Sequence, residues 1–382
     1  MALPGGETAF SFAAGTTYLD HGGFGVTPIE VRRFAFRMRE AVEAAPRPFF
    51  DRDCGPRWRE IAGQVAQRFS ASAGDLALVE NVTEGANAVL RALALRPGEE
   101  ILVTSMTYGA FALAARRIAA ERGARVVEAR IPFPAPDPER CVEAIRAALG
   151  PRVKLAILDH VTSATALVLP VAEMAAVCRE RGVRVLVDGA HAPGAVPLDV
   201  PAIGADWYVG NLHKWHFAPR GCGFLWARPD RPEPLAPAVL SWDVEKPFPR
   251  SFEWTGTRDP SGWLSVPAAF EFMDRFGEAD VRAHNHALVM EASRLLARAW
   301  SVEIETPKSM VGAMGLAPIP ELPGVSATEE GRASVQERLW IENAIACPCI
   351  LFEGRLYLRF SAQIYNGIGD YEKLARAVGE WV

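Results

Sequence analysis

The sequence is poor in features that mark several large classes of protein. Its 382 residues include only six cysteines, which have neither the paired spacing of a zinc ribbon nor the density of a secreted disulfide scaffold. No run of 18 apolar residues is free of charge, and the N-terminus has no basic segment followed by a long apolar stretch. These absences predict a cytoplasmic protein with reduced thiols and no membrane segment.

Positive charge is also scarce. Lys and Arg number 41 against 46 Asp and Glu, so the formal net charge is -5, and no stretch is rich in basic residues. Nucleic acid is therefore not expected as a partner. The hydrophobic content of 49% excludes a disordered chain, and the length suggests more than one domain around a sizeable core.

Between about residues 55 and 265, short apolar runs alternate with helical stretches. Gly123 and Gly182 follow two of these stretches as helix stops. The alternation predicts a mostly parallel sheet covered by helices on both faces. The expected strands are 101–104, 125–127, 155–159 and 184–188, and the expected helices between them include 110–122 and 171–181. A further helical stretch, 86–94, follows the short apolar run 76–79.

The C-terminal third has a different pattern. A proline-rich segment, 228–249, lacks periodicity, and a helix at 265–276 is expected to lead out of the large domain. Helices and strands then alternate up to a last helix at 371–381, with 346–352 as one strand that carries Cys347 and Cys349 as packing residues. We predict an N-terminal segment (1–14), a large domain (15–265) and a smaller α+β domain (266–382).

Asp188 ends the apolar run Val185-Leu186-Val187 and is followed by a glycine-containing turn, Gly189-Ala190-His191. The C-terminal ends of parallel strands are where open α/β sheets bind ligands. A buried carboxylate there needs a cation or several donors, and a protonated pyridine nitrogen would serve. An N-cap or loop-anchoring role is the alternative.

Lys214 lies between the apolar segment Tyr208-Val209 and the glycine-rich turn Gly221-Cys222-Gly223. A solvated surface charge is a poor explanation for a lysine in this position. Lysines that form Schiff bases need an enclosed site, because desolvation lowers the pKa toward a nucleophilic amine.

Upstream, Thr83-Glu84-Gly85 opens a helical stretch, which indicates either an anion site at a helix N-terminus or simple capping.

Together with further motifs, these residues resemble the class V aminotransferase family of fold type I pyridoxal-5′-phosphate (PLP) enzymes, and within it the isopenicillin N epimerase-like branch. The resemblance covers most of the chain. It implies a three-layer αβα large domain with a mostly parallel sheet and a smaller C-terminal α+β domain. The motifs are Gly22-Gly23-Phe24-Gly25, Thr83-Glu84-Gly85-Ala86-Asn87, Thr107-Tyr108-Gly109-Ala110, Leu158-Asp159-His160-Val161-Thr162-Ser163, Asp188-Gly189-Ala190-His191, His213-Lys214-Trp215, Trp254-Thr255-Gly256-Thr257-Arg258-Asp259 and Arg359-Phe360-Ser361-Ala362-Gln363-Ile364-Tyr365-Asn366.

The resemblance implies a role for each matching residue. Lys214 is similar to the lysine that holds PLP as a Schiff base, Asp188 to the partner of the ring nitrogen, and Tyr108 to the aromatic plate on the ring. With His191, beside the ring hydroxyl, these form the expected catalytic set. The other implied cofactor contacts are Asp159 and Thr162 near the ring, Thr83 with the Glu84 backbone and His213 at the phosphate, and Thr257 donated by a second subunit.

A homodimer with its active site at the subunit interface is therefore implied. Arg359 is similar to the residue that clamps the substrate α-carboxylate, which suits its bidentate fork. His21, Phe24 and Tyr365 complete the expected substrate side. Two positions depart from the family pattern: Asp20-His21-Gly22-Gly23 stands where asparagine and a Gly-Ser pair are usual, and Asp159 where asparagine is common.

The expected reaction is at the α-carbon of an amino acid, with Lys214 as general base. Epimerisation or transamination is the first interpretation, and epimerisation needs an acid on the opposite face, for which His21 and Tyr365 are candidates. β-Elimination by a C–S lyase, or desulfurase-like chemistry, is the alternative. Persulfide formation is not expected, because Cys347 lies in an apparent strand rather than a mobile loop.

Two interpretations of other kinds remain. Asp188, His191, His213 and His216 include an HxxH pair that could bind zinc in a metal-dependent hydrolase. A non-catalytic scaffold is the second, against which the joint presence of Lys214, Asp188 and Arg359 argues. We expect no metal.

Overall fold

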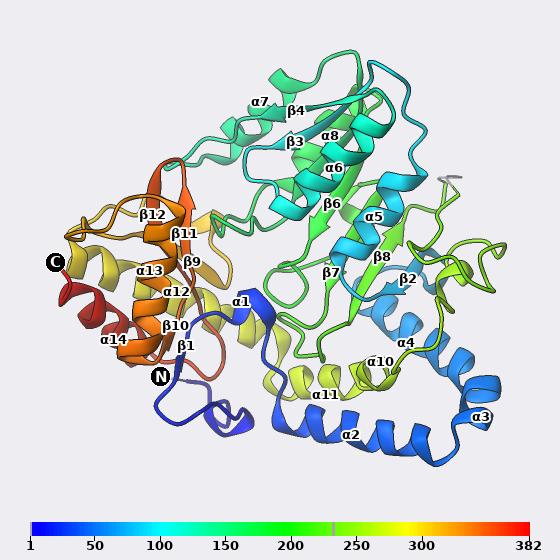
Figure 1. Cartoon of the computed structure of the whole chain (residues 1–382), viewed down its shortest axis with the longest axis horizontal. Coiled ribbons are helices and arrows are strands. Elements are labelled where there is room, and N and C mark those ends of the chain that lie inside the picture. Colours follow the sequence, from blue (N-terminus) through cyan, green and yellow to red (C-terminus); the bar gives the residue numbers. More distant parts are fainter. Residues whose placement is uncertain (1, 231–233) are drawn as a thin grey trace.

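The computed structural model describes residues 2–230 and 234–382, so residues 231–233 of the proline-rich segment lie outside the described residues. The chain forms a large unit around one sheet and a smaller unit around another, with α1 (His21–Phe24) between them (Figure 1). Both the N-terminus and the C-terminus lie on the side of the smaller unit (Figure 1).

The large sheet has the strand order β2-β8-β7-β6-β5-β3-β4. All neighbouring strands from β7 to β4 are parallel, whereas β8 runs antiparallel to both β7 and β2. The expected mostly parallel sheet is confirmed. Its strands are β2 (Leu76–Val79), β3 (Glu100–Thr104), β4 (Arg125–Ala129), β5 (Val153–Asp159), β6 (Arg184–Gly189), β7 (Trp207–Asn211) and β8 (Gly223–Ala227).

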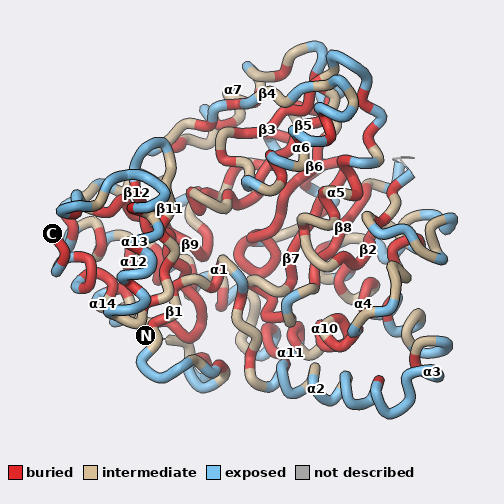
Figure 2. Tube along the Cα trace, viewed as in Figure 1, coloured by how far each residue is buried: buried red, intermediate tan, exposed pale blue. Residues whose placement is uncertain are grey.

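Both faces of this sheet are covered, which is why its central strands are largely apolar, whereas the edge strand β4 is partly exposed. In β6, Val185 and Val187 join one core cluster while Leu186 joins the other, as the alternation of side chains along a strand requires. Figure 2 shows these central strands buried. One face carries α5 (Val82–Ala92) and α6 (Gly109–Glu121); the other carries α4 (Cys54–Arg68), α7 (Pro138–Ala148), α8 (Val171–Glu180) and α11 (Val266–Phe276).

Local sequence fixes several helix ends. Asn81 caps α5 by accepting a hydrogen bond from the Glu84 N–H, so this helix begins earlier than the expected 86–94. Asp137 caps α7 in the same way, and Pro138 fits its first turn. The other helices of the large unit are α2 (Ile29–Ala44), α3 (Pro46–Pro48), α9 (Val200–Ile203) and α10 (Ser261–Leu264).

The smaller unit contains an antiparallel sheet of order β11-β12-β9 and a short parallel pair, β1 with β10. Its own core cluster includes Leu19, Leu358 and Tyr371. Its elements are β1 (Thr17–Tyr18), α12 (Glu278–Trp300), β9 (Met314–Pro318), α13 (Glu329–Asn343), β10 (Ile345–Ala346), β11 (Cys349–Phe352), β12 (Arg355–Ser361) and α14 (Ile368–Gly379).

The expectation of one strand over 346–352 is wrong. The segment divides into β10 and β11, which belong to different sheets, at Cys347 and Pro348. Proline lacks the N–H that a ladder requires, so a break at this point has a physical cause. Both cysteines are nevertheless buried, as expected for packing residues.

The predicted domain boundaries at 14/15 and 265/266 stay a proposal. The pairing of β1 with β10 attaches residues 17–18 to the smaller unit, although they fall within the predicted large domain. Among the described residues, no helix is both long and apolar enough to cross a membrane.

Candidate active site

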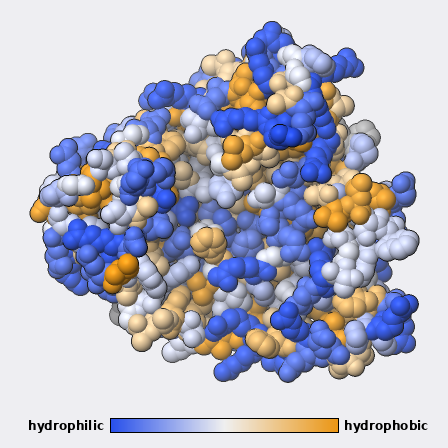
Figure 3. Space-filling model, viewed as in Figure 1, coloured by the Kyte–Doolittle hydropathy of each residue, from blue (hydrophilic) through white to orange (hydrophobic). Residues whose placement is uncertain are grey.

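The ends of β6 and β7 open onto a cavity of about 580 Å³ that residues 20–24 and β12 help to line. On the face shown in Figure 3, hydrophilic side chains dominate the middle of the molecule, between the two units. Eight of the residues predicted for the site line this cavity: Phe24, Thr83, Tyr108, Asp188, His191, His213, Lys214 and Arg359. Residues far apart in the sequence thus meet in one place.

Lys214 follows β7 and points its amine at His191, with 3.1 Å between Nζ and Nε2. Burial lowers the pKa of Lys214 to about 8, an effect that Arg359 adds to and that Asp188 and Asp20 oppose. Burial also holds the pKa of His191 well below its ordinary value, so its imidazole is neutral. The neutral His191 therefore places no second positive charge beside Lys214. With a pKa of about 8, the Lys214 amine loses its proton more readily near neutral pH than an ordinary lysine does.

Asp188 is buried at the end of β6, and one of its oxygens accepts a hydrogen bond of 2.9 Å from the Ala190 N–H. Burial raises the pKa of this carboxyl to about 6, while the Ala190 N–H and the Lys214 charge oppose the shift. Asp188 is thus ionised at neutral pH and lines the cavity as a negative charge with unused acceptor capacity.

The first turn of α5 forms another wall of the cavity. Asn211 accepts a hydrogen bond from the Val82 N–H at 3.1 Å, and Asn81 accepts one from Glu84. The Glu84 backbone is therefore occupied by its own helix cap, and Glu84 does not line the cavity, whereas Thr83 does. His213 lies opposite with Nδ1 at 3.3 Å from the Cys222 carbonyl, and burial lowers its pKa to about 4.

Tyr108 lines the cavity at the start of α6 and is 43% exposed. Asp159 lies beneath it, paired in register with Asp188, and accepts hydrogen bonds from the Thr104 and Thr107 hydroxyls and the Tyr108 N–H. Burial and the Asp188 charge raise the pKa of Asp159 well above its ordinary value. Asp159 does not line the cavity; in the structure it fixes the loop that presents Tyr108.

Arg359, on β12, donates hydrogen bonds to two residues, Ser163 and Asp20. Its Nη1 donates to the Ser163 carbonyl at 2.5 Å and its Nη2 to Asp20 Oδ1 at 3.2 Å. Its Nε has no partner among the described groups, although the side chain is only 8% exposed. A buried guanidinium with unused donors beside a cavity is suited to a carboxylate ligand.

His21 and Tyr365 do not line the cavity. The His21 ring is fully buried, with Nε2 at 2.7 Å from the Lys214 carbonyl and Nδ1 at 2.9 Å from the Tyr365 hydroxyl. The structure therefore does not bring these two side chains to the cavity, and their contact with substrate stays a prediction. Nε2 of His21 thus holds the backbone that carries Lys214, while Nδ1 holds the Tyr365 hydroxyl.

Two more predicted residues lie elsewhere. Thr162 is buried, because side chains alternate in this segment: Val161 and Ser163 face the cavity, while Thr162 bonds to Thr165 and to the Leu167 N–H. Thr257 is exposed and outside the cavity of its own chain. Its predicted place in a second subunit stays a prediction.

Several cavity residues had no role predicted from the sequence. Asp20 was recognised only as a departure from the family pattern, and Ser163 only as part of a motif. Arg220 lines the cavity and donates to the Gly25 carbonyl at 3.0 Å. Gln336, from α13, carried no sequence signal, because helix α13 meets the site only through the fold.

The residues of the zinc interpretation do not meet at one point. His216 is fully buried and packs against Phe69 and Phe270, whereas His213 faces the cavity. Within residues 2–230 and 234–382, no group of three or more His, Cys, Asp or Glu could hold a metal ion.

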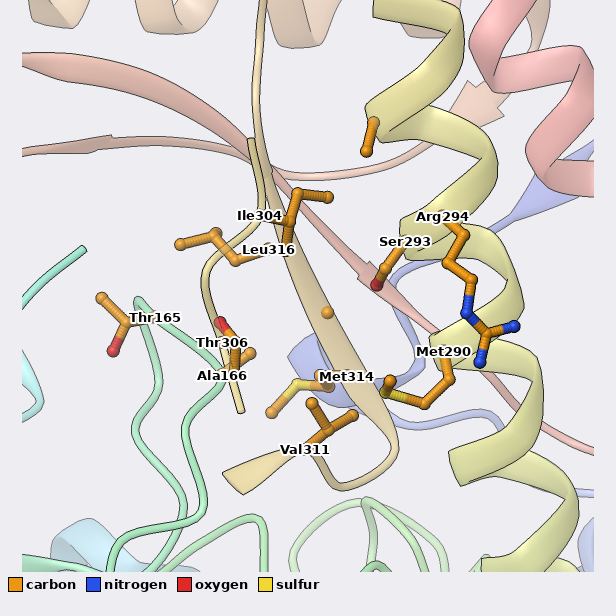
Figure 4. A pocket seen from close by; sticks show the side chains of 12 residues that line it. Thr165, Ala166, Met290, Ser293, Arg294, Ile304, Thr306, Val311, Met314 and Leu316 are labelled. Carbon is orange, nitrogen blue, oxygen red and sulfur yellow. The ribbon is translucent and has the colours of Figure 1, made fainter. Parts of the chain in front are cut away.

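A second cavity, of about 130 Å³ between α12 and β9, has Arg294 as its only charged lining residue among those described (Figure 4).

The chemistry of the large cavity fits PLP. It offers a buried amine of lowered pKa, a buried carboxylate for a protonated ring nitrogen, an exposed aromatic ring, and a helix N-terminus beside Thr83 for a phosphate. His191 lines the cavity, and its Nδ1 is buried without a partner among the described groups.

Comparison with known proteins agrees with this chemistry. An L-cysteine desulfhydrase of Arabidopsis thaliana is 34% identical and covers 68% of this chain and 63% of its own, and an isopenicillin N epimerase of Streptomyces clavuligerus is 33% identical over 94% of this chain and 93% of its own. The solved structure of the cystine C–S lyase C-DES shares the fold, with a TM-score of 0.80 at 22% identity, and covers 96% of this chain and 98% of its own. The family described as aminotransferase class-V matches residues 54–317, so the chain belongs to this family and is a PLP-dependent enzyme.

Proposed function

We propose that this enzyme is a C–S lyase that eliminates sulfide from L-cysteine or a closely related thiol amino acid. With cysteine and water, the balanced products are pyruvate, ammonia and hydrogen sulfide. The observation that carries the proposal is the burial of His21 and Tyr365 behind the Lys214 backbone. Neither candidate for an acid on the second face lines the cavity, and elimination needs proton abstraction on one face only.

The chemistry that PLP supplies when bound is an electron sink for a bond broken at the substrate Cα. Lys214 would hold the cofactor and then move the Cα proton, and neutral His191 at 3.1 Å from its Nζ would keep the amine in place. Asp188 would pair with the ring nitrogen, Tyr108 would stack on the ring, and Thr83 with His213 would face the phosphate. Arg359 would bind the α-carboxylate.

The state of the cysteines supports elimination over desulfuration. Cys347 is buried, its Sγ lies 3.6 Å from the Arg359 carbonyl, and burial raises the pKa of its thiol well above the ordinary value. A thiol that attacks a substrate sulfur must be an accessible thiolate. Cys347 is neither accessible nor readily ionised.

Epimerisation is the second candidate function, because the isopenicillin N epimerase is similar along nearly its whole length. One experiment separates the two. The protein is loaded with PLP, its visible spectrum is recorded, and borohydride reduction followed by peptide mass spectrometry tests for cofactor on Lys214. L-Cysteine and a panel of L- and D-amino acids are then added in deuterated water.

Sulfide and pyruvate in equal amounts, absent from a Lys214→Ala control, are the expected result. Recovery of the opposite enantiomer with deuterium at Cα and no sulfide would establish the epimerase instead. A spectrum without a cofactor band, or borohydride label on another lysine, would contradict the proposed site itself.

A homodimer in which Thr257 reaches the neighbouring subunit's site remains part of the proposal. It can be tested by mixing Lys214→Ala subunits with Thr257→Ala subunits under exchange conditions. If each site takes Lys214 from one subunit and Thr257 from the other, half of the sites in the mixed dimer are intact and activity returns. Sites built within single subunits would stay defective after mixing.

A further inference from the structure

Asp20 lies where β1 gives way to α1, at the edge of the active-site cavity. Its Oδ1 accepts a hydrogen bond of 3.2 Å from Arg359 Nη2, and its side chain is 17% exposed. In the free enzyme, a carboxylate of the chain therefore occupies a donor of the arginine that the proposed function assigns to the substrate carboxylate.

The backbone around Asp20 leaves room for this carboxylate. A Cβ atom on Gly23 would lie 2.5 Å from Asp20 Oδ2 and 2.6 Å from Oδ1, so a side chain at position 23 would collide with both oxygens. Leu19, the preceding residue, bonds through its N–H to the Ala346 carbonyl and through its carbonyl to the Ser361 N–H. Asp20 and Arg359 are thus held on neighbouring parts of the same unit.

We propose that Asp20 is a proton-linked gate for the substrate carboxylate: it holds Arg359 in the free enzyme and takes up a proton when the carboxylate of the substrate enters. The proposal rests on the proposed role of Arg359. A second negative charge beside Asp20 disfavours its ionised form, so the pair of carboxylates shares Arg359 best when one of them is protonated.

The groups around Asp20 make it the natural proton acceptor. Burial already raises its pKa in the free enzyme, although Arg359 on β12, Lys214 after β7 and the Gly23 N–H all act in the opposite direction. The neighbours that could titrate instead remain neutral, because burial raises the pKa of Tyr18 to about 12 and those of Cys347 and Tyr365 well above their ordinary values. Lys214, with a pKa of about 8, and Asp188, with a pKa of about 6, also line the cavity and can change charge.

The direction of the pH dependence follows from the linkage between proton binding and ligand binding. A ligand that raises the pKa of Asp20 binds with proton uptake in the pH range between the free and the bound pKa values, and its affinity falls as pH rises through that range. Above the bound pKa, the repulsion between two carboxylates opposes binding at full strength. Asparagine at position 20 would keep an oxygen for Arg359 but remove the charge and the proton.

The test uses the PLP-loaded enzyme and 3-mercaptopropionate, which has the carboxylate and thiol of cysteine but no amine to react. Calorimetric titration in two buffers of different ionisation enthalpy counts the protons taken up. For the wild type we expect uptake approaching one proton and a Kd that rises up to about tenfold per pH unit. For Asp20→Asn we expect no uptake, a flat Kd and tighter binding at high pH.

Arg359→Lys separates the two ways in which the idea can fail. If 3-mercaptopropionate does not bind the wild type, or binds Arg359→Lys equally well, the carboxylate site of the proposed function is wrong and the gate is wrong with it. If binding depends on Arg359 but wild type and Asp20→Asn show the same proton count, the gate alone is refuted. Because lysine and asparagine here replace residues of similar reach, far-UV circular dichroism suffices to check the fold.

Discussion

His21 makes the stability of this protein sensitive to acid, and replacing it by glutamine tests the reason. The Lys214 carbonyl can only accept, so His21 Nε2 must carry the proton, and Nδ1 must accept from the Tyr365 hydroxyl. A neutral ring satisfies both partners, and a second proton has no acceptor. Burial accordingly lowers the pKa of His21 from 6.5 to about 3.

The size of the effect follows from this shift. The unfolded chain takes up a proton at His21 below pH 6.5 while the folded chain refuses it until about pH 3, so the stabilisation present at neutral pH is lost as pH falls through this window. Between pH 7 and pH 5 the loss is about 2 kcal/mol for this single group. Glutamine can donate to the Lys214 carbonyl and accept from Tyr365, but it does not titrate.

The assay is urea-induced unfolding of the PLP-loaded enzyme at pH 7, 6 and 5, followed by tryptophan fluorescence. His21→Gln should lose about 2 kcal/mol less unfolding free energy over this range than the wild type. Tyr365→Phe is the matched control: it removes one hydrogen bond, so stability falls by about 1 kcal/mol at each pH with an unchanged slope. Parallel pH dependences of the wild type and His21→Gln would refute the reasoning.

Three further variants address the reaction. Asp188→Asn removes the charge that would pair with the ring nitrogen; a close pair of unit charges is worth about 4 kcal/mol at an effective dielectric constant of about 20, so kcat should fall about 1,000-fold; retention of a tenth of the activity would contradict the pairing. Arg359→Lys loses the bidentate fork and should raise KM for cysteine about 10- to 100-fold with a smaller change in kcat; equal losses in both would place the arginine in the chemical step instead. Cys347→Ala should keep sulfide release from cysteine, measured colorimetrically, and its loss would indicate persulfide chemistry.

The positions of Asp188 and Lys214 could be predicted because local sequence determines them. An apolar run fixes each strand of the central sheet, parallel strands end at the same edge, and the residues after those ends must meet there. The sequence thus indicated the large sheet, the cofactor and the side of the sheet on which the site lies. Boundaries differed by a few residues, mainly where a cap such as Asn81 extends a helix.

The contacts that shape the substrate side could not be predicted in this way. Arg359 meets Asp20 and Ser163 from distant parts of the chain, and nothing in local periodicity brings these three residues together. The burial of His21 behind Lys214 likewise depends on how residues 19–21 pass between the two units. Tertiary packing decided these positions, whereas hydrophobic patterning decided the strands.

Residues 19–21 connect the two units mechanically. Leu19 is hydrogen-bonded to strands of the smaller unit and His21 to the Lys214 carbonyl of the larger unit, so only two peptide bonds separate these attachments beside the active site. Two residues of chain span at most about 7 Å even when fully extended. A rotation of one unit against the other is therefore restrained beside the active site, where Lys214 of one unit and Arg359 of the other line the same cavity.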